Sequence, residues 1–256
     1  TENLYIKQLV KHLNYKYIEN KNFEDFASGR VIYHKSGYTN FPVRLAGEIF
    51  MTCLDIIGKN DGKAVVYDPC CGGAYLLTSL GFMLGDKIAS IYASDVSTDA
   101  VELAKENLNL LTVQGLNNRK SQLIEMYNEF GKESHNEAII SSDNLLKQIY
   151  SQNQLINCSV FSADITKQNS LSQKDFKADI VFTDIPYGNL VSWSDNSPFA
   201  IDKLLDTIAC VLNENSVVAI SSDKAQKITN AGYKIIRKII VGKRKIELLQ
   251  KVCLKQ

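Results

Sequence analysis

The sequence contains no apolar run long enough to cross a bilayer, and it shows no N-terminal signal pattern. Its six cysteines include no CxxC pair and no histidine-assisted metal spacing. Several of them lie inside apolar runs, where a thiol usually packs as a small hydrophobic group. We therefore expect a cytoplasmic protein with no membrane anchor, no disulfide framework and no metal. The 256 residues suffice for one large domain or two small ones.

Net charge is also nearly absent, at +1, but the charges are unevenly distributed. From Lys224 to the end, ten lysines and arginines stand against one acid, Glu247. Such a stretch is typical either of a solvated face or of a nucleic-acid footprint. The residues of this stretch that we predict to contact nucleic acid are Arg237, Lys238, Lys243, Arg244 and Lys245.

What the chain does have is a distinctive segment at 64–77, AVVYDPCCGGAYLL. A short apolar run ends at Asp68, and a glycine pair separates it from the start of an apolar helix. This order is typical of a binding loop in a parallel sheet. Gly72 and Gly73 let the backbone turn sharply and approach a ligand, because no Cβ stands in the way.

Four predicted strands each end in an aspartate, namely Asp68, Asp95, Asp164 and Asp184. Ligands of open α/β sheets bind outside the carboxyl ends of the strands. Four carboxylates there disfavour a phosphate-rich cofactor and favour S-adenosylmethionine, which carries a sulfonium, an amine, hydroxyls and an adenine amino group. The rival class, a dinucleotide-binding enzyme, would prefer GxGxxG, whereas this chain has GGAYLL.

The remaining pattern predicts an α/β domain with a mostly parallel seven-stranded sheet and an antiparallel C-terminal hairpin at 234–241 and 245–252. We expect residues 1–36 to form an N-terminal extension with one or two short helices, packed on a main domain of residues 37–256. A helical hairpin is inserted at about 115–155. Arg44 stands in the first turn of a helix, a poor place for a cation, and this indicates either an anion nearby, at the mouth of the binding site, or a plain surface salt bridge.

These residues resemble class I S-adenosylmethionine-dependent methyltransferases, which have a Rossmann-like fold. The segment Asp68–Ala74 is similar to their first motif, except that Ala74 stands where glycine is usual. The resemblance implies that Asp95 binds the ribose hydroxyls and that Asp164 accepts from the adenine amine. The full set of residues expected at the cofactor is Arg44, Asp68, Pro69, Cys70, Gly72, Gly73, Ala74, Asp95, Val96, Asp164, Ile165 and Asp184.

The tetrapeptide Asp184-Ile185-Pro186-Tyr187 resembles the motif of enzymes that methylate exocyclic base amines, usually (D/N)PP(Y/F), with Ile185 in place of the first proline. An aromatic amine is a poor nucleophile, and acceptors at Asp184 and the Ile185 carbonyl would localise its lone pair toward the methyl group. Pro186 holds Ile185 extended. Tyr187 offers a face on which a splayed-out base can stack.

Over residues 26–251 the chain resembles the AviRa-type 23S rRNA methyltransferases, which give resistance to avilamycin and evernimicin. FPVRLAGEIF, DPCCGGAYLLTSLG, the insert with NEFGKES, and TDIPYG occur in this order. The resemblance implies methylation of a guanine of 23S rRNA, free or in the large subunit, by a protein that we expect to be a monomer. The amine-type motif favours N2 over N1. A methyltransferase acting on tRNA or DNA, and a non-catalytic RNA-binding protein, remain alternatives.

Overall fold

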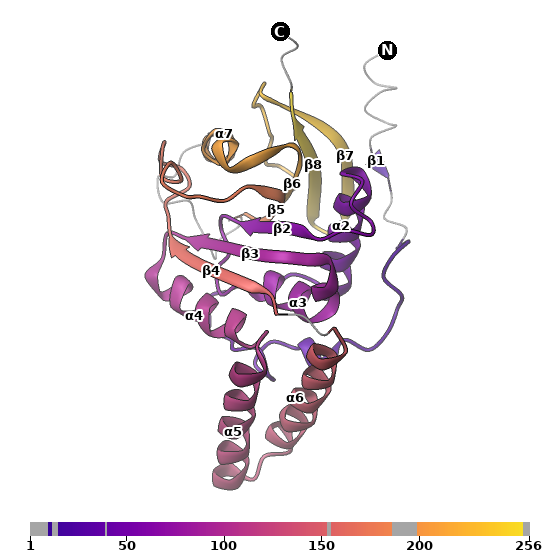
Figure 1. Cartoon of the computed structure of the whole chain (residues 1–256), viewed down its shortest axis with the longest axis vertical. Coiled ribbons are helices and arrows are strands. Elements are labelled where there is room, and N and C mark those ends of the chain that lie inside the picture. The colour runs from indigo at the N-terminus through magenta and orange to yellow at the C-terminus, as the bar shows by residue number, and fades with distance from the viewer. Residues whose placement is uncertain (1–9, 12–14, 39, 153–154, 186–198, 253–256) are drawn as a thin grey trace.

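A single mixed β-sheet forms the centre of the protein (Figure 1). The computed structural model describes residues 10–11, 15–38, 40–152, 155–185 and 199–252. Within these ranges the strand order is β1-β7-β8-β6-β5-β2-β3-β4. The strands are β1 (Val10–Lys11), β2 (Ala64–Asp68), β3 (Ile88–Asp95), β4 (Asn157–Ser162), β5 (Ala178–Asp184), β6 (Leu212–Asp223), β7 (Tyr233–Val241) and β8 (Arg244–Lys251).

The predicted seven strands and the antiparallel hairpin are confirmed. Only β8 runs against its neighbours, β6 and β7, while the other pairings are parallel. The two-residue strand β1, which the sequence did not predict, adds an eighth member beside β7. Because the parallel strands share one direction, β2, β3 and β5 bring their terminal aspartates to one edge of the sheet.

Hydrophobic cores lie on both faces of the sheet. In β5, Ile180 and Phe182 join the core under the helices α2, α3 and α4, while Val181 joins the core under α7. This alternation is what the two-residue period of a strand produces when both faces are covered. The helices span Val43–Ile56 (α2), Tyr75–Leu84 (α3), Thr98–Asn109 (α4) and Ala200–Ile208 (α7), with short 3-10 turns at Gly85–Lys87 (η2) and Ala209–Val211 (η3).

The predicted helical insert is confirmed as a hairpin of two long helices, α5 (Val113–Phe130) and α6 (Glu133–Gln152). Gly131 joins them with a left-handed φ of 61°, which glycine adopts without a steric penalty. The hairpin projects from the body near β4 and ends well away from the sheet (Figure 1). None of the helices in the described ranges combines the length and apolarity that a bilayer crossing requires.

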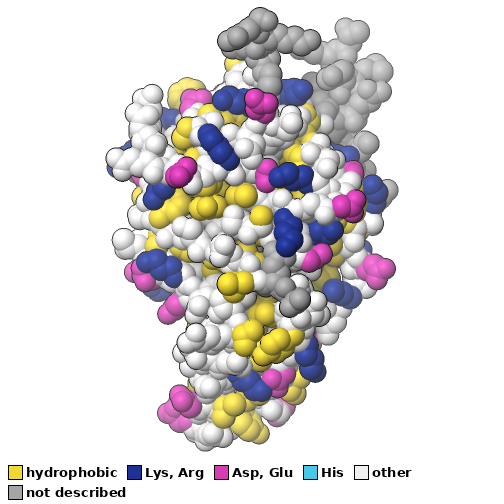
Figure 2. Space-filling model, viewed as in Figure 1, with side chains coloured by type: hydrophobic (Ala, Val, Ile, Leu, Met, Phe, Trp, Pro, Cys, Tyr) yellow, Lys and Arg dark blue, Asp and Glu magenta, His cyan; other side chains and the backbone are white. Residues whose placement is uncertain are grey.

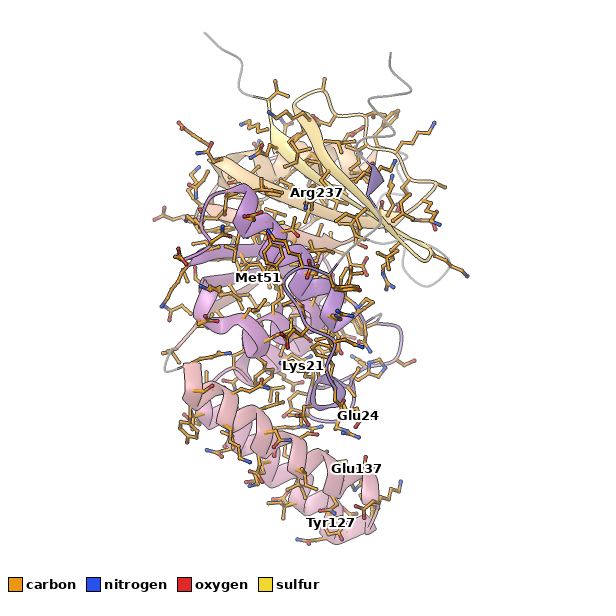
Figure 3. The ribbon with its side chains drawn as sticks, turned by 90° about the vertical axis from the view of Figure 1, so that its right-hand side faces the viewer. Lys21, Glu24, Met51, Tyr127, Glu137 and Arg237 are labelled. Carbon is orange, nitrogen blue, oxygen red and sulfur yellow. The ribbon has the colours of Figure 1, made fainter. Side chains whose placement is uncertain are left out.

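The N-terminal segment was expected to contain one or two short helices, and one short helical turn lies in its described part. In the part described, its helical structure is a single 3-10 turn, η1 (Glu24–Phe26). Its apolar residues Phe26, Val31 and Ile32 are fully buried in the same core as α2 and α3, but they do not follow a helical period. The segment is instead irregular and carries Lys21 and Glu24 between Met51 of α2 and Glu137 of α6 (Figure 3).

Hydrogen bonds to two side chains of α2 fix residues 16–18 of this segment. The buried carboxylate of Glu48 accepts from the backbone N–H groups of Lys16, Tyr17 and Ile18 at 2.6, 2.9 and 3.0 Å. Arg44 Nε donates to the Ile18 carbonyl at 3.0 Å, and its guanidinium lies 3.8 Å from the centre of the Tyr15 ring. Arg44 therefore anchors the N-terminal segment, which explains a cation in the first turn of the helix.

We predict that Glu48→Gln lowers the free energy of unfolding by about 1–3 kcal/mol, because the amide that replaces the buried carboxylate offers one oxygen where three backbone N–H donors share two. Urea unfolding measures this change. Glu102→Gln is the matched control, since Glu102 is exposed and its ion pair within the described ranges is with Lys105 of its own helix; the substitution should change the free energy of unfolding by no more than about 0.5 kcal/mol. Equal stability of the Glu48→Gln variant and the unsubstituted protein would contradict this account.

Candidate functional site

A cavity of about 500 Å³ opens at the carboxyl edge of the sheet and contains the four aspartates predicted from the strand ends. Its volume is within the usual range for a small-molecule site. The cofactor-site residues of the sequence prediction that line it are Asp68, Pro69, Cys70, Gly72, Gly73, Asp95, Val96, Asp164, Ile165 and Asp184. Arg44 and Ala74 do not line it, and Arg44 Nε instead donates to the Ile18 carbonyl.

Asp68 is the most deeply buried of these carboxylates, with 3% of its surface exposed. Burial raises its pKa to about 7, and the neighbouring carboxylates of Asp95 and Asp184 act in the same direction. The backbone N–H of Cys70, which donates to Asp68 Oδ1 at 3.0 Å, partly opposes the shift. Asp68 thus holds a proton near neutral pH that a cationic ligand would displace.

The glycine pair shapes the loop after β2. Gly72 has a left-handed φ of +52° and donates its N–H to Asp95 Oδ2 at 2.9 Å, so the loop and β3 are joined at the cavity wall. A Cβ on Gly73 would lie 2.6 Å from a methyl carbon of Leu103 of α4, so any other residue here would require that side chain to move. Ala74 also adopts a left-handed φ, 55°, so the methyl group at this usual glycine position is strained by roughly 1–2 kcal/mol.

Local hydrogen bonds orient two further carboxylates. Asp95 Oδ1 accepts from the backbone N–H of Ser97 at 3.0 Å. Asp164 Oδ1 accepts from the backbone N–H and the hydroxyl of Thr166, at 3.1 and 2.7 Å. Asp164 Oδ2 also lies 3.4 Å from Lys167 Nζ. Both carboxylates line the cavity, and carboxylate oxygens accept from hydroxyl or amine donors of a ligand.

One wall of the cavity was missed by the sequence analysis. Residues 33–38 and 40–41 line it, and a Cβ on Gly72 would lie 3.3 Å from the Tyr38 ring. Buried Asn107 of α4 holds this wall, because it accepts from the Tyr33 N–H at 2.8 Å and donates to the carbonyls of Tyr33 and Gly73. An asparagine within the otherwise apolar stripe of a helix was the available signal.

The strand β5 delivers Asp184 and Ile185 to the cavity. Ile185 is buried, and its N–H donates to the Ser221 carbonyl at 3.0 Å, which holds the end of β5 against β6. Asp184 Oδ2 lies 3.8 Å from Arg244 Nη2. The predicted Pro186 and Tyr187 fall outside the described residues.

The five basic residues predicted to contact nucleic acid do not share one surface. Lys243 is exposed in the turn between β7 and β8. Lys245 is 3% exposed and pairs with buried Glu247 at 2.9 Å, and Lys238 pairs with the same carboxylate at 3.6 Å. Residues 245 and 247 are two apart on a strand and share a face, so Lys245 neutralises an internal charge and is not available to RNA.

Arg237 and Arg244 lie in two other places. Arg237 is on the face of the sheet that α2 covers, near Asp55 (Figure 3). Arg244 lies beside the cavity, as described above. In the view of Figure 2, basic and acidic side chains alternate on the surface, without one continuous basic patch. The outer half of the hairpin is acidic, with Glu125, Glu129, Glu133 and Glu137 exposed against Lys132, which disfavours contact with phosphates there.

The chemistry of the cavity is that of a carboxylate-lined site. Within the described ranges, no group of three or more His, Cys, Asp or Glu is arranged to hold a metal ion. Cys70 and Cys71 are free, and burial raises the pKa of both thiols well above the usual value, so neither is an activated nucleophile. The arrangement suits a cationic ligand with several hydrogen-bond donors.

Comparison with known proteins gives matches over nearly the whole chain. The family described as rRNA methyltransferase AviRa matches residues 13–244. A curated protein of Streptomyces viridochromogenes, named 23S rRNA (guanine(2535)-N(1))-methyltransferase, is 34% identical over 236 residues, which cover 91% of this chain and 94% of the relative.

Solved structures agree with this match. The rRNA methyltransferase AviRa of Streptomyces viridochromogenes is 33% identical, with a TM-score of 0.81 over 92% of this chain and 96% of that one. TrmN of Thermus thermophilus, 15% identical with a TM-score of 0.51 over 85% of this chain and 51% of that one, shares the fold alone. The predicted methyltransferase fold and family are thus confirmed: the chain belongs to the AviRa family of rRNA methyltransferases.

Proposed function

We propose that this protein transfers a methyl group from S-adenosylmethionine to N1 of a guanine in 23S rRNA, in the cytoplasm, and so gives resistance to orthosomycin antibiotics. Family membership and the named activity of the 34% identical relative support the substrate. The observation that carries the chemistry is the convergence of Asp68, Asp95, Asp164 and Asp184 on one cavity. The relative's name gives N1 as the acceptor atom, against our preference for N2 from the amine-type motif.

The residues of the cavity fit the cofactor. S-adenosylmethionine supplies an electrophilic methyl group on a sulfonium cation. Asp95 would accept from the ribose hydroxyls and Asp164 from the adenine amine, since both carboxylates line the cavity and carboxylate oxygens accept from such donors. Asp68 would face the ammonium end. The crowding of carboxylates supports a cationic ligand, because phosphates would be repelled.

The end of β5 is the proposed place for the acceptor guanine. Asp184 would accept the N1 proton, and the Ile185 carbonyl would accept from the neighbouring N2 amine. The bond from Ile185 N–H to Ser221 keeps this acceptor pair fixed to the sheet. Alignment of the target nitrogen with the methyl group would supply much of the acceleration. A guanine in a duplex is not reachable, so it must be flipped out or already unpaired.

The substrate proposal is tested by methyl transfer from labelled cofactor to isolated 23S rRNA, tRNA and DNA. We expect label only in 23S rRNA, with one new primer-extension stop, because a methyl group at N1 blocks the pairing edge of guanine. Expression in an orthosomycin-sensitive bacterium should raise its resistance. Label in tRNA or DNA, in place of rRNA, would establish one of the two alternative substrates. Labelled rRNA without a stop would favour N2.

We predict that Asp184→Ala lowers the rate of methyl transfer by about 100-fold or more, because the acceptor of the N1 proton is lost. The affinity for S-adenosylmethionine, measured by calorimetry, should change only a few fold. Asp61→Ala, which removes an exposed carboxylate from a surface turn, is the control and should transfer methyl groups at the normal rate. Full activity of the Asp184→Ala variant would remove the proposed role.

The raised pKa of Asp68 makes ligand binding depend on pH. The folded carboxyl has a pKa of about 7 and the unfolded one a pKa near 3.8. Between these values the folded state holds a proton that the unfolded state releases, so without ligand this residue destabilises the fold as pH rises from about 4 to 7. A cationic ligand pairs with the ionised form, so its binding strengthens over the upper part of that interval.

We therefore predict that the affinity for S-adenosylmethionine rises about eightfold between pH 6.0 and pH 7.5, as the ionised fraction of Asp68 increases. In Asp68→Asn, the affinity should be lower at pH 7.5 and nearly independent of pH. Calorimetry at the two pH values measures both, with Asp61→Asn as the control that keeps the normal slope. If the affinity of Asp68→Asn still rises with pH, the pH dependence belongs to another titrating group.

A further inference from the structure

Arg244, which opens β8, reaches the cavity from the opposite side of β6. Its backbone pairs with Asp223 of β6, yet its guanidinium lies 3.8 Å from Asp184 Oδ2. The same guanidinium lies 5.4 Å from the Phe41 ring centre and donates from Nη2 to the Asn40 carbonyl at 3.4 Å. Asn40, Phe41 and Asp184 all line the cavity, so Arg244 stands at its rim.

The position of this side chain is well determined by its neighbours. Phe41 packs edge-on against buried Phe182, with ring centres 5.4 Å apart, and so offers a fixed surface to the guanidinium. The Arg244 side chain is 25% exposed. Its Nε–H is buried and has no hydrogen-bond partner within the described part of the chain. A guanidinium carries five N–H donors, so this one keeps several for a ligand.

The pairing edge of guanine complements an acceptor and a donor side by side. N1–H donates, and the adjacent O6 accepts. Two parallel hydrogen bonds to neighbouring edge atoms place the protein acceptor and donor about 3–4 Å apart. The separation between Asp184 Oδ2 and Arg244 Nη2 is 3.8 Å. Arginine is also the most common side chain on guanine O6 in nucleic-acid complexes.

We propose that Arg244 is the residue that selects guanine and stabilises its reacting form, by donating to O6 while Asp184 takes the N1 proton; this deepens the proposed function and rests on it. The N1–H bond breaks and its proton passes to the Asp184 carboxylate. The electron pair left on N1 forms the new bond to the methyl carbon, and the pair of the broken C–S bond stays on sulfur. Negative charge shared by N1 and O6 faces the Arg244 guanidinium.

Selection follows from the same contact. Adenine carries an amino group where guanine carries O6, and its donor hydrogens would meet the donors of Arg244. An arginine offers no acceptor, so the mismatch leaves buried N–H groups unpaired. The residue therefore both favours guanine and disfavours adenine at the same ring position.

The test is Arg244→Gln, with the rate of methyl transfer to 23S rRNA measured against pH. We expect the maximal rate to fall about 100-fold, as for the loss of a donor to developing negative charge. The rising limb of the profile should move to higher pH, because N1 gives up its proton less readily without the guanidinium. Arg244→Lys should restore part of the rate. Among the described residues, Arg244 and Asp68 are charged groups that interact with Asp184, so the pH profile of Asp68→Asn is recorded alongside.

Lys63→Gln is the control, because Lys63 is exposed just before β2, at the end of that strand opposite the cavity; the pH profile of this variant should keep its rising limb at the normal pH. A purely structural Arg244 would lower the melting temperature and the cofactor affinity and leave the limb in place, which would overturn the assignment. If the unsubstituted enzyme methylates an atom other than N1, the proposed function fails and the assignment fails with it. Normal N1 transfer with an unmoved limb in Arg244→Gln overturns the assignment alone.

A binding measurement covers the case in which Arg244→Gln folds poorly and its rate is uninformative. An rRNA fragment that carries the unmethylated target guanine is compared with a fragment that carries 2-aminopurine at that position. 2-Aminopurine lacks both O6 and N1–H. We expect 2-aminopurine to weaken binding to the unsubstituted protein about tenfold, and to weaken binding to Arg244→Met, whose side chain has no donor, less. Equal losses for the two proteins would show that Arg244 does not contact O6.

Discussion

Repulsion among carboxylates at one edge of the sheet is the interaction on which the rest of the site depends. Parallel strands bring Asp68, Asp95, Asp164 and Asp184 to a single cavity, and such crowding opposes folding. The chain reduces it in three ways: backbone N–H groups donate to Asp95 and Asp164, Asp68 holds a proton near neutral pH, and Arg244 lies beside Asp184. The repulsion that remains favours a positively charged ligand, so stability and ligand binding are linked.

The fold and the four aspartates of the cavity could be predicted because short-range patterns in the sequence determine them. Apolar runs that end in an aspartate define parallel strands, and parallel topology then brings their ends together with no further information. The helical spacing within residues 113–152 was likewise sufficient to predict the inserted hairpin. In each case the pattern depends on neighbours in the sequence, and the tertiary structure follows from a general rule of sheet geometry.

The wall at 33–41 and the destinations of the basic residues depend on contacts between distant segments. Tyr38 rests on Gly72, and no period in the N-terminal segment indicates this. Arg44 does not line the cavity, and its Nε donates to the carbonyl of Ile18, a contact between distant segments that the sequence does not indicate. The density of basic residues led us to predict that Lys245 is exposed, although it pairs with Glu247, two positions further along the same strand.

The left-handed alanine at position 74 limits how this loop can change. Its side chain is fully buried where α3 begins, so a larger residue would lack both room and an allowed backbone conformation. Glycine relieves the strain at the cost of a more flexible unfolded chain, and the two effects are of similar size. The loop nearest the ligand therefore tolerates few substitutions at position 74, and exchange between alanine and glycine is the main change that evolution can make there.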